Sequence, residues 1–356
     1  MVHDVRNICI CGGGNEAHAL AAFLSNGGNK VSVLTRNPEK WNDKLIAYFK
    51  DKTIEGDIYV SDNPVEVIPQ ASLILLLAPA YAYEDILKKI SEHVNPMSYV
   101  GSIPGTGGFN YFCEKYLNPK VVYFSSTRVP FISRTREYGN SVDITGLVHG
   151  NMKYAISNDK HRDYILSMMS ELLHIDSSCL PSFLCVNLVN SNSLLHTARL
   201  YSLGTESKSW EKPPLFYGEW DNNASELIIK LDNELFNLYD NIPNVDFSCM
   251  TNMLDHYEST NPTEMTQKIK SIKSVQYLET DTVIVDSKHI LDISSRYFTE
   301  DFPYGIALIS IIAKQYGVKT KYIDMVANWG LDIIGRDMLY VRKLFNKYID
   351  INTRTH

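Results

Sequence analysis

His196 lies on a predicted helix together with other polar side chains. The stretch 190–199 reads NSNSLLHTAR, and Asn192 precedes His196 by four positions, which places both residues on one helix face. A histidine becomes an acid or base that works near neutral pH when a carboxylate orients its ring. Without such a partner, His196 is explained equally simply as a core or surface histidine. At this point the sequence leaves both interpretations open.

A charged and aromatic segment late in the chain could supply that carboxylate. Residues 295–305 read SRYFTEDFPYG and place Arg296, Glu300 and Asp301 among four aromatic rings. The segment is either a solvated loop that happens to be charged or part of an active site. The elements that position it must decide between the two.

The beginning of the chain has the order of a βαβ unit. A strand at 7–11 is followed by a glycine turn, a helix at 16–24 that ends at Gly27-Gly28, and a second strand at 30–34. Within this unit Gly12-x-Gly14-x-x-Ala17 has the form of the dinucleotide-binding fingerprint. Its first glycine permits a tight turn, its second lets the backbone approach a diphosphate, and Ala17 lets the helix pack closely on the sheet. The free N–H groups at the helix start then face the phosphates. We therefore expect the cofactor to lie against residues Gly12, Gly13, Gly14, Asn15 and Ala17.

The end of the second strand indicates which dinucleotide is preferred. NAD-binding proteins usually carry an acidic residue there for the ribose hydroxyls, but this chain reads Leu34-Thr35-Arg36-Asn37. Arg36 can pair with a 2′-phosphate and stack on adenine, although it is also explained as a surface arginine. We predict NADP as the preferred cofactor, with NAD as the alternative.

Further strands predict an α/β fold with a doubly wound, Rossmann-type sheet. Residues 72–78 form a continuous apolar run, as expected for a strand covered on both faces, and strands are also predicted at 99–103 and 121–124. Ligands of such sheets bind beyond the carboxyl ends of the strands. There lie Ala78 and Pro79, the loop 104–108 and the residues 125–127, although ordinary turn chemistry explains each of these equally well.

After about residue 180 the pattern changes to helical periodicity. The predicted helices are 184–203, 223–239, 262–277, 306–316 and 325–334, and a polar, aromatic loop occupies 205–222. We predict two domains, a dinucleotide-binding domain at 1–181 and an all-helical catalytic and substrate domain at 182–356.

Composition excludes several classes of partner. The 356 residues are 44% hydrophobic and 21% charged, and the net charge of −7 comes without any basic run, which argues against nucleic acid or an anionic membrane surface. No signal peptide and no apolar run long enough to span a bilayer is evident. The six cysteines lack metal-binding spacing, so we expect a cytoplasmic protein without a metal. Its oligomeric state, monomer or homodimer, stays open.

The order of these motifs resembles the opine dehydrogenases, the octopine/nopaline dehydrogenase group. The resemblance runs over essentially the whole chain and is carried by GGGNEAHA at 12–19, by the N-x-x-x-H helix start at Asn192 and His196, and by RYFTEDFPYG at 296–305. It implies that the protein condenses a 2-oxo acid with the amino group of an amino acid and reduces the imine with NAD(P)H, giving an N-(1-carboxyalkyl) amino acid.

The resemblance also implies roles for individual residues. His196 corresponds to the family's catalytic histidine, Asp301 to its aspartate partner, and Arg296 to the arginine that binds the oxo-acid carboxylate. Thr106 and Thr127 match segments that flank the oxo-acid site, and we include Asn192 among the substrate-binding residues. Glu300 is then expected to point elsewhere, either as a helix cap or toward the amino group.

The chain departs from the family pattern at two places. Ser193 and Thr197 stand where members often have prolines around the histidine, and Thr106 stands where some members carry a longer amide side chain. Two other functions were weighed: a 2-hydroxyacid or ketopantoate-type dehydrogenase, which typically uses a catalytic lysine in its second domain, and a non-catalytic NADP-binding sensor. The first is disfavoured by His196 at the helix start, and the second by the presence of His196, Arg296 and Asp301 together.

Overall fold

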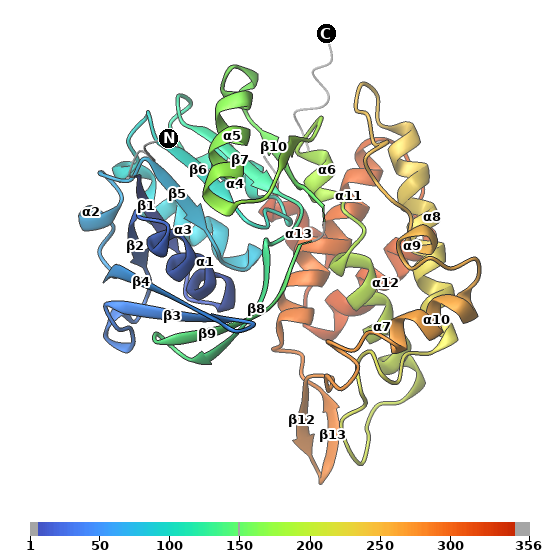
Figure 1. The fold of residues 1–356 in the computed structure, drawn as a ribbon. Coiled ribbons are helices and arrows are strands. Elements are labelled where there is room, and N and C mark those ends of the chain that lie inside the picture. The colour runs from blue at the N-terminus through green and yellow to red at the C-terminus, as the bar shows by residue number, and fades with distance from the viewer. Residues whose placement is uncertain (1–5, 149, 346–356) are drawn as a thin grey trace. The chain divides into compact units, whose positions relative to one another are not determined.

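A computed structural model describes residues 6–148 and 150–345 (Figure 1). The chain divides into two compact units, 1–186 and 187–356. The sequence had suggested a division between 181 and 182, within the short stretch that follows the last strand of the first unit.

The first unit is built on a mixed sheet of eleven strands. Its strands are β1 Asn7–Cys11, β2 Lys30–Leu34, β3 Lys44–Phe49, β4 Lys52–Ser61, β5 Leu73–Leu76, β6 Tyr99–Ser102, β7 Val122–Ser126, β8 Phe131–Glu137, β9 Ser141–Leu147, β10 Met152–Ile156 and β11 Ser177–Cys179. Its longer helices are α1 Asn15–Asn26, α3 Tyr83–Ile90, α4 Phe109–Tyr116 and α5 Arg162–Leu173, with short helices α2 Pro64–Val67 and α6 Leu184–Asn187.

The centre of the sheet has the strand order of a Rossmann fold. Strands β4, β2, β1, β5, β6 and β7 lie side by side and parallel, which is the order 3-2-1-4-5-6 of a doubly wound sheet. The strand order reverses beside β1, so the carboxyl ends of β1 and β5 form the place where such sheets bind dinucleotides. The predicted fold class of this unit is confirmed.

Two hairpins extend the sheet in a way that the sequence analysis did not predict. The β3–β4 hairpin follows β2 directly, where a helix usually connects these strands, and β9 then pairs with β3 while β8 pairs with β9. Helix α1 packs against β4, β3 and β8. Residues Ala17 to Ala22 and Leu24 are consequently buried, because α1 has sheet on more than one side.

The second unit is helical with one hairpin. Its elements are α7 Asn192–Glu206, α8 Asn222–Asn241, α9 Met253–His256, α10 Pro262–Lys270, the strands β12 Thr282–Val285 and β13 Lys288–Leu291, the π-helix η5 Tyr297–Ile306, α11 Ala307–Gln315, α12 Lys321–Ile333 and α13 Met338–Leu344. The β12–β13 hairpin extends away from the helices of this unit (Figure 1) and corrects the expectation of an all-helical domain. Trp210, in the loop after α7, pairs with His289 of β13.

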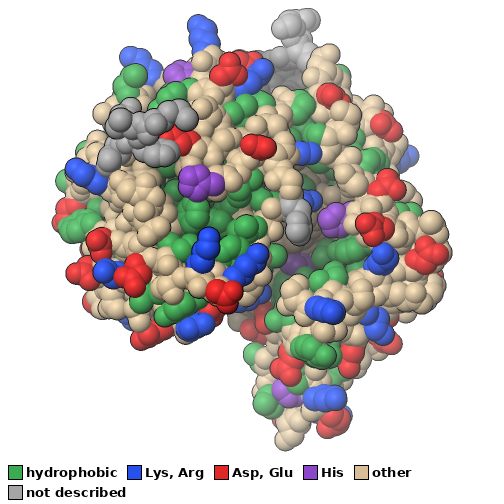
Figure 2. Space-filling model, in the orientation of Figure 1, with side chains coloured by type: hydrophobic (Ala, Val, Ile, Leu, Met, Phe, Trp, Pro, Cys, Tyr) green, Lys and Arg blue, Asp and Glu red, His purple; other side chains and the backbone are tan. Residues whose placement is uncertain are grey.

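Two global features follow from the described residues. Between residues 6 and 345, apart from 149, no helix is long and apolar enough to cross a membrane, and no group of three His, Cys, Asp or Glu is placed to hold a metal ion. Acidic and basic side chains are interspersed on the face drawn in Figure 2 rather than gathered by sign.

Candidate active site

The glycine turn after β1 leaves open space at the position where a diphosphate should approach. Gly12 has φ +150°, and a Cβ on it would lie 2.2 Å from the carbonyl oxygen of Leu77. A Cβ on Gly13 would lie 2.9 Å from the hydroxyl of Tyr138. In contrast, a Cβ on Gly14, the residue just before α1, would meet nothing within 4 Å. Gly12 is thus required by the protein's own backbone packing, whereas the space beside Gly14 fits a ligand.

The polar residues at the start of α1 bind the β8–β9 hairpin. Asn15 Oδ1 accepts hydrogen bonds from the backbone N–H of Thr135 and from its hydroxyl, at 2.9 and 2.8 Å. His18 Nε2 accepts from the backbone N–H of Gly139 at 2.8 Å, so Nδ1 carries the proton and donates to the carbonyl of Gly14, also at 2.8 Å. Burial lowers the pKa of His18, in agreement with a neutral ring. His18, for which the sequence indicated no role, therefore holds the glycine turn in place.

Glu16 is the one acidic residue in the first turn of α1. Its carboxyl is buried, with Oε2 accepting from the hydroxyl of Ser133 at 3.2 Å, and burial raises its pKa to about 8. The group is consequently protonated at neutral pH. It carries no charge that would repel a diphosphate at the adjacent turn.

Replacing Glu16 by glutamine should stabilise the protein at alkaline pH. In the unfolded chain Glu16 ionises near its ordinary pKa of about 4.3, whereas the folded state keeps the proton up to about pH 8. The folded state therefore binds more protons across this window, and stability falls as the pH rises through it. We expect Glu16→Gln to raise the melting temperature at pH 9 by on the order of 5 °C and to change it little at pH 5. Thermal unfolding of both proteins, with exposed Glu92→Gln as the control, checks this; an equal shift at both pH values would contradict it.

The loops at the carboxyl ends of the neighbouring strands lie beside this turn. Leu77 donates its N–H to the carbonyl of Cys11 at 2.9 Å, which places Ala78 and Pro79 next to the glycines. Gly105 donates its N–H to the carbonyl of Ser126, also at 2.9 Å, so the loop of Thr106 lies against the strand end that leads to Thr127. The two threonines are partly exposed, and Arg36 is exposed just beyond β2.

In the second unit His196 and Asp301 are hydrogen-bonded. His196 Nδ1 lies 2.8 Å from Asp301 Oδ2, and both side chains are largely buried, with exposed fractions of 12% and 17%. His196 sits in the second turn of α7 and Asp301 in the middle of η5. These two elements approach closely at Gly305, where an added Cβ would lie 2.7 Å from the hydroxyl of Ser193. Ser193 thus stands in packing contact at a position where the family often has proline.

Aromatic rings frame the histidine. The rings of Tyr297 and Phe216 both meet the His196 ring edge to face, with centroids at 4.8 and 5.6 Å, and they stack on each other at 4.8 Å. Tyr297 and Asp301 belong to one π-helix, a distortion that occurs in a segment containing Pro303, which has no N–H to donate. Phe298, Phe302 and Tyr304 of this segment are buried, so the segment is not a solvated loop.

Arg296 lies at the exposed edge of this segment. Its side chain is 70% exposed, and its guanidinium pairs with Glu300, whose exposed fraction is 17%. The spacing of four residues along one helical face brings the two side chains together. Glu300 therefore contacts Arg296. From the sequence it was expected to cap a helix or to point toward the substrate amino group. Asn192, the first residue of α7, is exposed.

Two residues at this site were not identified from the sequence. The hydroxyl of Tyr217, in the loop after α7, lies 3.1 Å from His196 Nε2. Arg199, one helical turn after His196, is 1% exposed and pairs with Asp221 at 2.6 Å. An arginine between Ala198 and Leu200 on an apolar helix is the signal that could have found it, because a buried cation requires a carboxylate partner.

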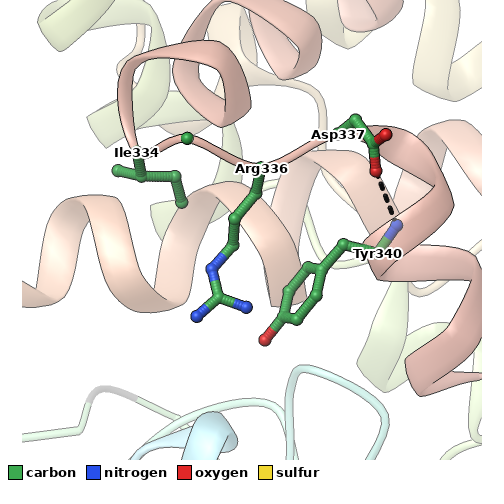
Figure 3. Close-up of a pocket in the computed structure, with 5 residues that line it drawn as sticks. Ile334, Arg336, Asp337 and Tyr340 are labelled. Atoms are coloured by element: carbon green, nitrogen blue, oxygen red, sulfur yellow. Dashed lines mark hydrogen bonds between the residues drawn. The ribbon is translucent and has the colours of Figure 1, made fainter.

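The second unit also has an open pocket elsewhere. It is lined by Ile334, Gly335, Arg336, Asp337 and Tyr340. The Arg336 guanidinium lies over the Tyr340 ring, 3.8 Å from its centroid (Figure 3). None of the residues around His196 lines this pocket, which therefore forms no part of the site.

Comparison with known proteins agrees with the two-unit division of chemistry. Residues 179–334 match the model of the NAD/NADP octopine/nopaline dehydrogenase alpha-helical domain, and residues 7–101 match that of the NADP oxidoreductases, coenzyme F420-dependent. Tauropine dehydrogenase of Arabella iricolor is 26% identical over 96% of this chain and 95% of its own, and octopine dehydrogenase of Pecten maximus is 25% identical over 93% and 91%.

A solved structure of octopine dehydrogenase with NADH and L-arginine has the same fold. It superposes with a TM-score of 0.80 over 93% of this chain and 90% of its own, at 24% identity. The helical-domain model, the relatives that span nearly the whole chain and the shared fold agree with one another. Over nearly its whole length the chain is similar to opine dehydrogenases, and its residues 179–334 match the helical domain of the NAD/NADP octopine/nopaline dehydrogenases.

Proposed function

We propose that this protein catalyses the NAD(P)H-dependent reductive condensation of a 2-oxo acid with the amino group of an amino acid. The observation that carries the proposal is the His196–Asp301 hydrogen bond in the helical domain of this family. The relatives named for octopine and tauropine formation supply the reaction class. The product is an N-(1-carboxyalkyl) amino acid.

The residues after β1 fit a dinucleotide. The space beside Gly14 and the backbone N–H groups at the start of α1 would take the diphosphate, while the protonated Glu16 adds no charge there. Bound NAD(P)H supplies the hydride that reduces the imine carbon. Beyond β2, Arg36 favours NADP, because no acidic residue stands there for the ribose hydroxyls.

His196 and Asp301 handle protons in this scheme. Formation of the imine requires the amino group to lose a proton and the carbinolamine oxygen to gain one before it leaves as water. The carboxylate of Asp301 holds Nδ1 of His196, which fixes the orientation of the ring and leaves Nε2 to exchange the proton.

The remaining candidate residues would bind the substrate, beginning with the carboxylate of the oxo acid. Arg296 presents a largely exposed guanidinium that pairs with Glu300, and in exchange for this partner it can bind the oxo-acid carboxylate through two parallel hydrogen bonds. Thr106 and Thr127 offer hydroxyl groups on adjacent loops for the same substrate, and Asn192 offers an amide. The amino-acid substrate is left for experiment.

The test is a matrix of substrates with the purified protein. NADPH or NADH is mixed with one oxo acid (pyruvate, glyoxylate or 2-oxoglutarate) and one amino acid at a time, and cofactor oxidation is followed by absorbance. We expect oxidation that requires both substrates, with a higher kcat/KM for NADPH than for NADH. Oxidation with the oxo acid alone would make the protein a hydroxyacid dehydrogenase. Binding of NADPH without turnover of any pair would support a sensor.

Removing the Arg296 guanidinium should weaken oxo-acid binding. We expect Arg296→Ala to raise the KM for the oxo acid by roughly 100-fold, since a bidentate pair with a carboxylate is lost, and Arg296→Lys to give an intermediate value because it keeps only the charge. The KM for NADPH should stay unchanged. Steady-state kinetics measure both constants, and Arg336→Ala, which removes an arginine of the separate pocket in Figure 3, is the control. An unchanged KM for the oxo acid in Arg296→Ala would exclude this role.

A further inference from the structure

The tyrosine hydroxyl beside His196 occupies the position through which a proton would leave the histidine. Nδ1 of His196 is engaged by Asp301 at 2.8 Å, so Nε2 is the remaining ring nitrogen. Tyr217 Oη lies 3.1 Å from that nitrogen. When the ring is neutral with its proton on Nδ1, Nε2 is an acceptor and the tyrosine donates to it. A substrate must therefore meet Tyr217 before it can exchange a proton with His196, unless it displaces the tyrosine.

A buried arginine fixes the loop that carries this tyrosine. Arg199 donates to the carbonyls of Phe216, Leu215 and Glu219 at 3.0, 3.2 and 2.8 Å. It also pairs with Asp221, which caps the start of α8 by accepting from the N–H of Ala224. Backbone carbonyls on both sides of Tyr217 are thus bound to a residue of the same helix as His196. The position of the Tyr217 hydroxyl therefore depends on the hydrogen bonds and the ion pair that Arg199 makes with this loop.

Tyr217 is less buried than the residue before it. The neighbouring Phe216 is fully buried, whereas Tyr217 is only partly buried, and its ring lies parallel to that of Trp220 at 6.2 Å. The ring is therefore positioned by packing, and the residue is not fully enclosed. This combination suits a group that passes a proton between a buried histidine and a bound molecule.

We infer that Tyr217 is a further catalytic residue, the one that carries protons between His196 and the reacting amine and oxygen. This rests on the proposed function. In the first step the substrate ammonium gives a proton to Tyr217 Oη as the tyrosine proton moves to His196 Nε2. The freed amine then forms the C–N bond with the oxo carbon as the C=O π bond breaks, and a second proton passes from the nitrogen to the resulting oxyanion, which gives the neutral carbinolamine. In the second step Nε2 returns its proton through Tyr217 to the carbinolamine hydroxyl. The C–O bond breaks, water leaves, and the protonated imine accepts the hydride.

The atoms and charges of this scheme balance over the cycle. His196 and Tyr217 end in the protonation states in which they began. The hydride comes from the nicotinamide, and the secondary amine formed takes its last proton from solvent. In each transfer, Tyr217 Oη therefore accepts one proton while it donates another, so two protons move together.

Phenylalanine at position 217 isolates the hydroxyl from the ring. The packing on Phe216 and Trp220 needs no hydroxyl, so Tyr217→Phe should fold with a melting temperature close to that of the parent protein. We expect kcat to fall by roughly tenfold to 100-fold, with the KM values for the oxo acid and NADPH unchanged. Rates in mixtures of H₂O and D₂O give the discriminating readout. The parent protein should show a curved dependence on deuterium content, as two protons move together, and the variant a linear one.

The outcomes separate this inference from the proposed function. If the parent protein oxidises no cofactor with any oxo acid and amine, the proposed function fails. If the parent is active but shows a linear deuterium dependence, or if Tyr217→Phe keeps its kcat, the relay is overturned. A rise in KM alone would likewise overturn it and make Tyr217 a substrate-binding group. Tyr201→Phe is the matched control, because Tyr201 is on α7 and packs against Trp329 instead of His196.

Discussion

Replacing His196 by alanine should lower kcat by about 1,000-fold while leaving the affinity for NADPH unchanged. General acid–base catalysis by a positioned side chain contributes roughly 10²–10⁴-fold to a rate, and the variant removes the group that receives and returns the substrate proton. The affinity should not change because the dinucleotide-binding turn belongs to the first unit, whereas His196 belongs to the second. Single-turnover oxidation of NADPH gives the rate, and quenching of protein fluorescence gives the affinity.

A second histidine of the same unit provides the control. His289 lies on β13, where its ring contacts the hydroxyl of Thr282 at 2.9 Å, and it has no role in the proposed reaction. His289→Ala should keep the parent kcat. If His196→Ala lost NADPH binding as strongly as it lost turnover, His196 would be a structural residue and the acid would have to be sought elsewhere.

The parts of the fold that depend on local sequence were predictable. The strands at 7–11 and 30–34 have the predicted bounds, because apolar runs bounded by glycines mark each segment. The hairpin β3–β4 was missed, since a helix is the usual connection after the second strand. Strands β8 and β9 were missed for another reason: they join the sheet through β3, and nothing within their own residues reveals that partner.

The π-helix η5 could not be predicted from the sequence, because the residue types in this segment usually indicate a break in a helix. A helix was predicted at residues 306–316, whereas η5 and α11 form one continuous helical segment from 297 to 315. Proline and glycine in one short stretch, Pro303 and Gly305, usually indicate a break. Here the helical segment continues through both residues, and Gly305 leaves room for the close approach of Ser193 on α7.

The site divides along the same line. The pairing of His196 with Asp301 followed from resemblance and not from periodicity, because the two residues are 105 positions apart. Tyr217 could not be selected among the aromatic residues of the 205–222 loop, since its contact with His196 depends on carbonyls bound by Arg199. Likewise, the pairing of Arg296 with Glu300 depends on a helix that the sequence placed later in the chain. Long-range hydrogen bonds decided the positions of His196 and Tyr217, whereas the Arg296–Glu300 pair is local.

Adding a methyl group at Gly14 should abolish most cofactor affinity without unfolding the protein. The backbone at Gly14 is extended, with φ −85° and ψ −173°, which any residue adopts, and its Cβ position is open. The new methyl group would stand where the diphosphate approaches and would separate it from the N–H groups of α1. Losing one or two charge-assisted hydrogen bonds of about 1.5–3 kcal/mol each should raise the NADPH Kd by roughly 100-fold. Fluorescence titration measures this Kd.

The neighbouring glycine gives the contrast that makes the result interpretable. Gly12 has a left-handed φ of +150° and no room for a Cβ against Leu77, so Gly12→Ala should lower the melting temperature as well as the affinity. The two variants differ by two positions in one turn, yet only Gly14→Ala should combine a parental melting temperature with weak binding. Parental affinity in Gly14→Ala would mean that the diphosphate does not approach this backbone. The free space beside Gly14 would then have to be explained without a dinucleotide, and the proposed hydride donor would lose its binding site.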